Sequence, residues 1–139
     1  MIVYLDTSVV LRALFGQEPQ WNGWGGWDTA WSSELMGVEA RRSIDRFRLQ
    51  GALEDSGVAE AQQLLRRMES AIGSIGLTRP VIRRASMPMA TVVKTLDAIH
   101  LSSAQLLAEH QNVQPVFVTH DESQALAARA LGFDVEGAG

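Results

Sequence analysis

The chain of 139 residues contains no cysteine, one lysine, one tyrosine and four prolines. The missing cysteines exclude disulfide bonds, thiolate zinc sites and a cysteine nucleophile. Long apolar runs are missing too: Ile2–Leu5 and Val116–Val118 are far shorter than the roughly 20 residues that a membrane helix needs. The first residues reach Asp6 without a basic region or a cleavage site. We therefore expect no signal peptide and an intracellular protein.

A broad basic surface is also missing. The formal net charge is −4, from 16 acidic and 12 basic residues, and every basic residue except Lys94 is an arginine. Proteins that hold nucleic acid over a wide surface carry the opposite sign, so contact with a polyanion would depend on bound cations and on local arginines. A GC-rich genome would produce the same excess of arginine.

Length and composition predict one globular domain over residues 1–139, since apolar residues make up 46% and charged residues 20%. Short β-rich runs alternate with helical stretches, which predicts the α/β class, with a mainly parallel central sheet flanked by helices on both faces. The expected strands are Ile2–Leu5, Ile75–Leu77, Pro115–Thr119 and Phe133–Val135. The expected helices are Thr7–Phe15, Ser33–Gln50, Ser56–Ile72, Pro80–Met87, Thr95–His110 and Glu122–Leu131.

The segment Gln17–Trp31 contains all four tryptophans, spaced three, three and four residues apart, together with three glycines. On a helix the tryptophans would form one stripe, but the glycines disfavour a helix. Three interpretations stay open for Trp21, Trp24, Trp27 and Trp31: core filling, packing against a protein partner, and stacking on RNA bases.

Two aspartates follow expected strands. Asp6 comes directly after the first strand, and Asp121 lies between Pro115–Thr119 and the helix that follows. In open α/β sheets the carboxyl ends of the strands form the ligand-binding edge, so these two acids can converge there. Helix capping explains each aspartate taken alone, and Asp121 with Gln124 fits a capping box.

Asp97 and Glu39 lie on helices. Thr95 is a candidate N-cap that places Asp97 in the first turn, where the helix dipole favours an acid without any further function. Apolar neighbours put its carboxylate close to a buried face, where an unpaired charge is costly. Glu39 lies in a helix interior, where a bond to Arg42 or Ser43 is the simpler explanation. Glu34, in the first turn, is the weaker candidate for a site.

Together Asp6, Glu39, Asp97 and Asp121 would form an oxygen-only cluster. Such a cluster suits Mg²⁺ or Mn²⁺, hard cations that keep several waters and contact substrate phosphates. A cation held there could activate water and stabilise the leaving oxygen in phosphodiester cleavage.

Four ordered segments resemble the motifs of PIN-domain ribonucleases: Val3–Ser8, Ser33–Arg42, Thr95–Ala104 and Thr119–Asp121 with the residues that follow. They span nearly the whole chain, and the acidic positions of the family align with those same four acids. A PIN domain that fills a chain of this length is similar to the VapC-type toxins of prokaryotic toxin–antitoxin modules.

The resemblance implies a cytoplasmic, Mg²⁺-dependent endoribonuclease toxin, with Mn²⁺ able to substitute, held inactive by a cognate VapB-like antitoxin. It implies Asp6, Glu39, Asp97 and Asp121 as catalytic and metal-binding residues, supported by Ser8 and Thr119. It also implies a homodimer and a structured RNA substrate such as transfer or ribosomal RNA, with no membrane partner.

Two other functions compete with this interpretation. A phosphoacceptor receiver domain is also a small α/β protein, but receivers pair acids after the first strand and place a lysine after a late strand, whereas Lys94 precedes Thr95. A catalytically silent PIN-fold binding protein is the second alternative, and the presence of all four acids argues against it. The three histidines are not spaced like zinc ligands, and no serine lies in a nucleophile-elbow pattern.

Overall fold

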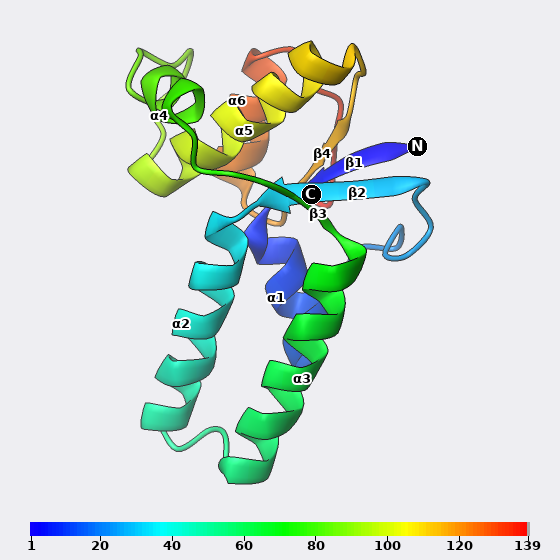
Figure 1. Ribbon diagram of the computed structural model, residues 1–139, viewed down its shortest axis with the longest axis vertical. Coiled ribbons are helices and arrows are strands. Elements are labelled where there is room, and N and C mark those ends of the chain that lie inside the picture. Colours follow the sequence, from blue (N-terminus) through cyan, green and yellow to red (C-terminus); the bar gives the residue numbers. More distant parts are fainter. Residues whose placement is uncertain (139) are drawn as a thin grey trace.

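The computed structural model describes residues 1–138 and contains a five-stranded sheet in the order β3-β2-β1-β4-β5 (Figure 1). Every neighbouring pair of strands is parallel. The first strand is therefore central, with its carboxyl end at the same edge as those of its neighbours. The strands are β1 Ile2–Leu5, β2 Thr29–Ser33, β3 Gly73–Ile75, β4 Val116–Val118 and β5 Val135–Glu136.

Within residues 1–138, six helices form two layers, one on each face of the sheet. Figure 1 shows α1, α2 and α3 on one side and α4, α5 and α6 on the other. The helices are α1 Thr7–Phe15, α2 Leu35–Leu49, α3 Asp55–Ala71, α4 Arg79–Ala85, α5 Thr95–Gln111 and α6 Glu122–Ala130. Among residues 1–138, no helix is long and apolar enough to span a bilayer.

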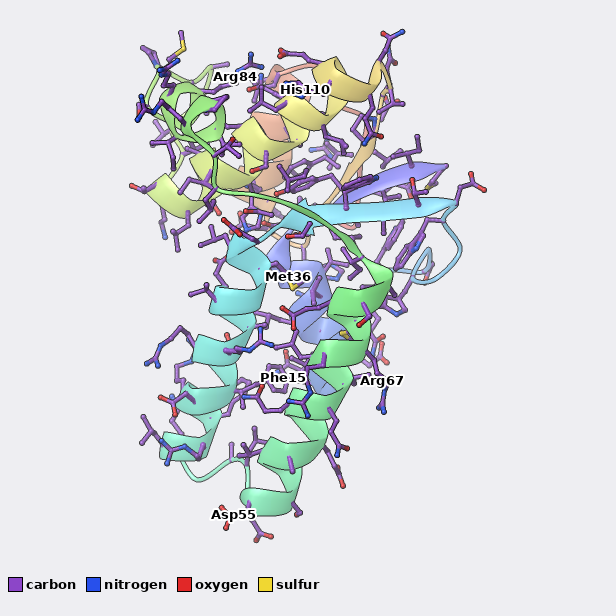
Figure 2. The ribbon with its side chains drawn as sticks, in the orientation of Figure 1. Phe15, Met36, Asp55, Arg67, Arg84 and His110 are labelled. Atoms are coloured by element: carbon purple, nitrogen blue, oxygen red, sulfur yellow. The ribbon has the colours of Figure 1, made fainter. Side chains whose placement is uncertain are left out.

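β1 is buried on both faces because each layer covers one side of its alternating side chains. Val3 and Leu5 pack into the core with α1, α2 and α3, whereas Tyr4 packs with α5 and α6. Figure 2 shows Phe15 and Met36 in the space between α1, α2 and α3. This two-sided burial fixes β1 firmly and places the residue after it, Asp6, at a rigid position.

The expected fold class is confirmed, and each expected helix and strand lies within two residues of its observed bounds. One strand, β2, was not expected. Its sequence is short and polar, and two of its serines are buried. Hydrogen bonds satisfy them, because Ser32 Oγ donates to the carbonyl of Leu5 at 2.7 Å and Ser33 Oγ accepts from the amide of Leu35 at 3.0 Å. Hydrophobic periodicity cannot reveal a strand stabilised in this way.

The tryptophan segment is not a helix. Trp21 is 8% exposed and belongs to the core beside α1, with Trp24 and Trp27 packed against it. Trp21 and Trp27 stack at 6.2 Å between ring centroids. A Cβ at Gly23 would lie 2.2 Å from the Trp21 ring, which explains the glycine there. Core filling is therefore what the structure supports for these three side chains.

Candidate active site

The four acidic residues predicted from the sequence lie at the carboxyl edge of the sheet. Asp6 follows β1, Asp121 follows the neighbouring β4, and Asp97 and Glu39 lie near the starts of α5 and α2. Asp6, Asp121 and Glu39 are all close enough to raise the pKa of Asp97 by charge repulsion. The fold therefore brings together carboxylates that are up to 115 residues apart in the chain.

Asp6 is the best-buried of the four, at 5% exposure. Its Oδ2 accepts hydrogen bonds from Ser8 Oγ at 2.7 Å and from Thr119 Oγ1 at 2.8 Å. Its Oδ1 lies 4.0 Å from Nε2 of His100. The two hydroxyls predicted to support the site therefore bind the same carboxylate oxygen, one from α1 and one from the end of β4.

Asp121 caps α6, as predicted, with Oδ1 accepting from the amide of Gln124 at 3.0 Å. Its own amide donates to Thr119 Oγ1 at 3.1 Å, which connects it to Asp6. The reciprocal half of a capping box does not form. Instead, Gln124 Nε2 donates to the carbonyl of Asp97 at 3.1 Å. This bond joins the start of α5 to the start of α6.

Two buried side chains, Thr7 and His100, hold Glu39 in place. Its Oε1 accepts from Thr7 Oγ1 at 2.7 Å and lies 2.7 Å from Nε2 of His100. Burial raises the pKa of Glu39, but the hydrogen bond and charge of His100 and the bond from Thr7 outweigh it, so the pKa is lowered overall. Glu39 is therefore ionised at neutral pH. The sequence-based pair with Arg42 does not occur, because Arg42 pairs with Asp45 at 3.3 Å, and within residues 1–138 no hydrogen bond joins Glu39 to Ser43.

His100 connects Glu39 to the core. It is 1% exposed, and its Nδ1 lies 2.8 Å from the hydroxyl of Tyr4. Burial lowers the pKa of His100, but Glu39, Asp6 and Asp97 raise it by more. Burial and then the charge of Asp6 raise the pKa of Tyr4 well above its usual value. Tyr4 therefore stays a phenol, and Nε2 of His100 carries the proton directed at Glu39.

Asp97 is the exception among the four. Among residues 1–138 its carboxylate has no hydrogen-bond donor and no salt-bridge partner, although its backbone carbonyl accepts from Gln124. Burial first, then repulsion by Asp6 and Asp121, raises its pKa to about 6. The N-cap of α5 is Lys94, not Thr95 as predicted, so Thr95 is the first helical residue and its hydroxyl does not cap the helix.

The chemistry of these donors fits a hard divalent cation. Asp6, Glu39 and Asp121 each accept protein hydrogen bonds through one oxygen only, which leaves the second oxygen of each carboxylate without a hydrogen-bond donor among residues 1–138. In the same part of the chain, no group of three or more His, Asp or Glu side chains is arranged to hold a metal by itself. Mg²⁺ typically uses one or two carboxylates and several waters, so it does not require such a closed cage.

Sequence reasoning missed three parts of the site: Thr7, His100 and the link from Gln124 to Asp97. His100 lies three residues after Asp97 on α5, so both face the same side of the helix. That spacing was the available signal for His100. Glu34, the weaker candidate, accepts instead from the amide of Leu77 at 2.6 Å.

Comparisons with known proteins concern the sequence and the fold as a whole. No family model matches the chain. Ribonuclease VapC47 of Mycobacterium tuberculosis (strain CDC 1551 / Oshkosh) is 29% identical over 133 residues, which cover 95% of this chain and 93% of that protein. A chain in the crystal structure of VapBC2 from Rickettsia felis, bound to a DNA fragment from their promoter, matches with a TM-score of 0.67 at 13% identity and covers 98% of both chains.

The fold and the acidic edge of the sheet define a PIN-like α/β domain. The chain is similar to VapC-type PIN-domain proteins in sequence over nearly its whole length, and it has their fold. The resemblance predicted from the four motifs is therefore confirmed.

Proposed function

We propose that the chain is a divalent-cation-dependent endoribonuclease of the VapC toxin type, active on RNA when no antitoxin is bound. One observation carries this proposal: four carboxylates meet at one sheet edge, three of them fixed by protein donors through a single oxygen. The full-length similarity to a VapC ribonuclease supports it.

Asp6, Glu39, Asp97 and Asp121 would hold Mg²⁺ or Mn²⁺ through the carboxylate oxygens that accept no hydrogen bond from the protein. A bound cation would lower the pKa of a water molecule and neutralise charge on the leaving oxygen. Thr7 and His100 orient Glu39, while Ser8 and Thr119 orient Asp6. These bonds fix the carboxylates before substrate binds, so little reorganisation is needed during the reaction.

Asp97 is the best-placed acceptor for the proton of the attacking water. No protein donor occupies its carboxylate among residues 1–138, so one oxygen is free to take this proton while the other faces the cation. The water oxygen forms the new bond to phosphorus as the bond from phosphorus to the leaving sugar oxygen breaks. The water gives one proton to Asp97, and the leaving oxygen takes a proton from solvent.

The experiment is cleavage of end-labelled total cellular RNA by antitoxin-free protein with Mg²⁺, with Mn²⁺ and with chelator, beside Asp97→Asn. Discrete fragments that disappear with chelator and with the variant would support the nuclease and identify its substrate, for which transfer and ribosomal RNA are the first candidates. Intact RNA with every cation would contradict it and favour the catalytically silent binding protein.

We further propose that the cytoplasmic toxin is a homodimer inhibited by a VapB-like antitoxin, which inserts an arginine among the carboxylates. A guanidinium would form charge-assisted bonds with these acids and take the place of a cation. Inhibition by the antitoxin should therefore weaken as the Mg²⁺ concentration rises. Inhibition that is indifferent to Mg²⁺ would contradict direct occupation of the site.

A further inference from the structure

A hollow of about 440 Å³ lies beside the acidic site, between α1, the start of α6 and the tryptophan segment. Its volume is in the range of small-ligand pockets, about 300–1,000 Å³. Trp21 forms one wall, and the polar side chains that line it are Arg12, Gln20, Asn22, His120 and Glu122.

The hollow is joined to the site by two structural links. His120 lines it, and the amide of His120 donates to Ser8 Oγ at 3.0 Å, the same hydroxyl that donates to Asp6. Arg12 lies one turn after Ser8 on α1, so the two side chains are neighbours on one helix face, with Cβ atoms about 6 Å apart. An RNA strand lying across the carboxylates would therefore have the hollow beside it.

The chemistry of the lining is mixed. Arg12 uses Nη1 to bind the carbonyl of Pro19 at 2.8 Å, and its guanidinium has further N–H groups for a phosphate. Gln20 and Asn22 have amides that can both donate to and accept from the edge of a base, and the Glu122 carboxylate can accept from an exocyclic amine. A bare anion would use only the donors of the lining, whereas a nucleotide would use its acceptors too.

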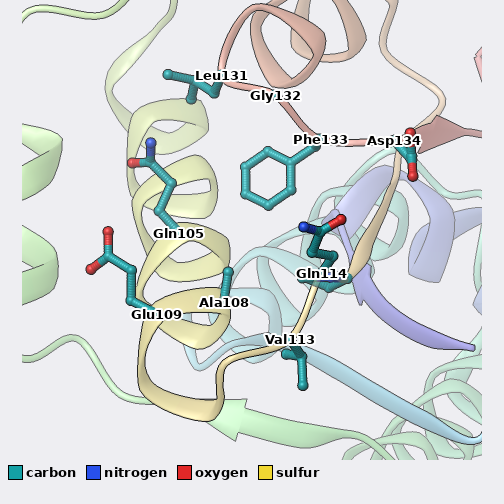
Figure 3. Close-up of a pocket in the computed structure, with 10 residues that line it drawn as sticks. Gln105, Ala108, Glu109, Val113, Gln114, Leu131, Gly132, Phe133 and Asp134 are labelled. Atoms are coloured by element: carbon teal, nitrogen blue, oxygen red, sulfur yellow. The ribbon is translucent and has the colours of Figure 1, made fainter.

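Two other hollows lack these links. One of about 390 Å³ between β2, β3, α4 and α5 is lined mostly by apolar side chains such as Trp31 and Val81. Another, shown in Figure 3, lies beside Gln114 and Asp134, which precede β4 and β5. It therefore lies at the opposite edge of the sheet from the carboxylates.

We infer that the hollow beside Asp121 binds the RNA nucleotide next to the cleaved phosphodiester, with Arg12 at its phosphate and Gln20, Asn22 and Glu122 at its base. This inference rests on the proposed nuclease function. If the inference holds, these residues determine which nucleotide the protein accepts next to the cleavage site. It also supplies a local cation to a chain whose overall charge is negative.

Direct binding tests the inference without any cleavage. Trp21 Nε1 donates to the Glu136 carboxylate at 3.1 Å, and Trp21 lines the hollow, so its indole N–H resonance reports on occupancy. ¹⁵N-labelled antitoxin-free protein is titrated with 5′-AMP, 5′-GMP, 5′-CMP and 5′-UMP in the presence of Mg²⁺. We expect a saturable shift of the Trp21 indole signal with at least one nucleotide, and no shift for Trp31, which lines the apolar hollow.

Variants connect this binding to the named side chains. Arg12→Gln should weaken the nucleotide affinity about tenfold, the usual effect of losing a charged hydrogen bond. Arg12→Lys, which keeps the charge, should recover part of it. Arg67→Gln is the matched control, because Arg67 is exposed on the side of α3 away from α2 (Figure 2) and changes the net charge equally.

A cleavable RNA then shows whether base identity is read. Asn22→Ala and an abasic substitution at the neighbouring nucleotide should each slow cleavage, and together they should slow it no more than the abasic substitution alone. Additive effects would overturn the inference while leaving the nuclease intact. A Trp21 signal that no mononucleotide shifts, but that the antitoxin shifts, would overturn it in favour of a protein-binding hollow. If the unaltered protein cleaves no RNA at all, the proposed nuclease function itself would be overturned.

Discussion

Two acids of the same site are held in opposite ways. Asp6, at the end of the central strand, is 5% exposed and accepts two hydroxyl hydrogen bonds. Asp97, at the start of α5, is half-buried beside three like charges and has no donor for its carboxylate within residues 1–138. The protein supplies two hydroxyl donors to the carboxylate at the strand end and none, within residues 1–138, to the carboxylate at the helix start. A bound cation would therefore offset the most charge repulsion beside Asp97.

The largest expected effect comes from Asp6→Asn. The side-chain oxygen of asparagine can still accept hydrogen bonds from Ser8 and Thr119, but the negative charge is lost. We expect RNA cleavage to fall roughly 100- to 1,000-fold, as when a preorganised electrostatic group is lost, with little change in the unfolding midpoint. Single-turnover cleavage and thermal melting measure the two effects. Retained cleavage would exclude Asp6 from the active site.

His100→Leu is expected to destabilise the protein by about 2–3 kcal/mol, because Tyr4 loses its buried partner and Glu39 loses a donor. His100→Gln keeps an N–H for Glu39 and should lose less. Urea unfolding compares the two variants, and the same order should appear in cleavage rates. Equal losses in both variants would mean that the donor to Glu39 has no separate role.

Thr119→Val keeps the shape of the side chain and removes the hydroxyl that joins Asp6 to the amide of Asp121. We expect a loss of about 1–2 kcal/mol. Thr95→Val is the control, since Thr95 is exposed and should change stability by less than about 0.5 kcal/mol. An equal effect of both substitutions in urea unfolding would contradict the stabilising role of Thr119.

The smallest effect is a gain in stability. The pKa of Asp97 is about 6 in the folded chain and about 3.9 when unfolded. The folded state therefore holds this proton more tightly, and ionisation of Asp97 costs stability as pH rises from about 4 to 6. In chelator at pH 7.5, Asp97→Asn should raise the Tm by about 3 °C, after discounting for solvent screening. The gain should vanish near pH 4.

Saturating Mg²⁺ should reverse that sign at pH 7.5. The unaltered protein should then gain more thermal stability than Asp97→Asn, because a ligand that binds only the folded state stabilises it by mass action. Calorimetry with and without Mg²⁺ measures the difference. Equal gains would mean that Asp97 does not contribute to cation binding.

Sequence patterns were sufficient for the parts of this molecule that depend on local chemistry. The buried run Ile2–Leu5, the helix that begins at Thr7 and the capping role of Asp121 all follow from short-range preferences. Asp6 and Asp121 could be placed at one sheet edge because parallel strands end together, whereas Glu39 and Asp97 lie on helices and were added to them through the resemblance to PIN-domain ribonucleases. That prediction required the order of elements and no knowledge of distances.

The parts that escaped prediction depend on contacts between distant residues. β2 is polar, and one of its buried serines bonds to Leu5, 27 positions earlier. His100 reaches Glu39 across 61 positions, and Gln124 reaches Asp97 across 27. A polar side chain on a helix carries no local sign of whether its partner is solvent or another element. Only the packed structure distinguishes the two.

The strand order has a consequence for the synthesis of this chain on the ribosome. β4 pairs directly with β1, so Thr119 and Asp121 reach Asp6 only after almost the whole chain has been translated. A nascent chain that ends before β4 lacks Thr119, one of the two hydroxyls that orient Asp6, and it also lacks the fourth carboxylate. The proposed activity would therefore begin late in translation, when the last strands emerge, and shorter products of interrupted synthesis would be inert.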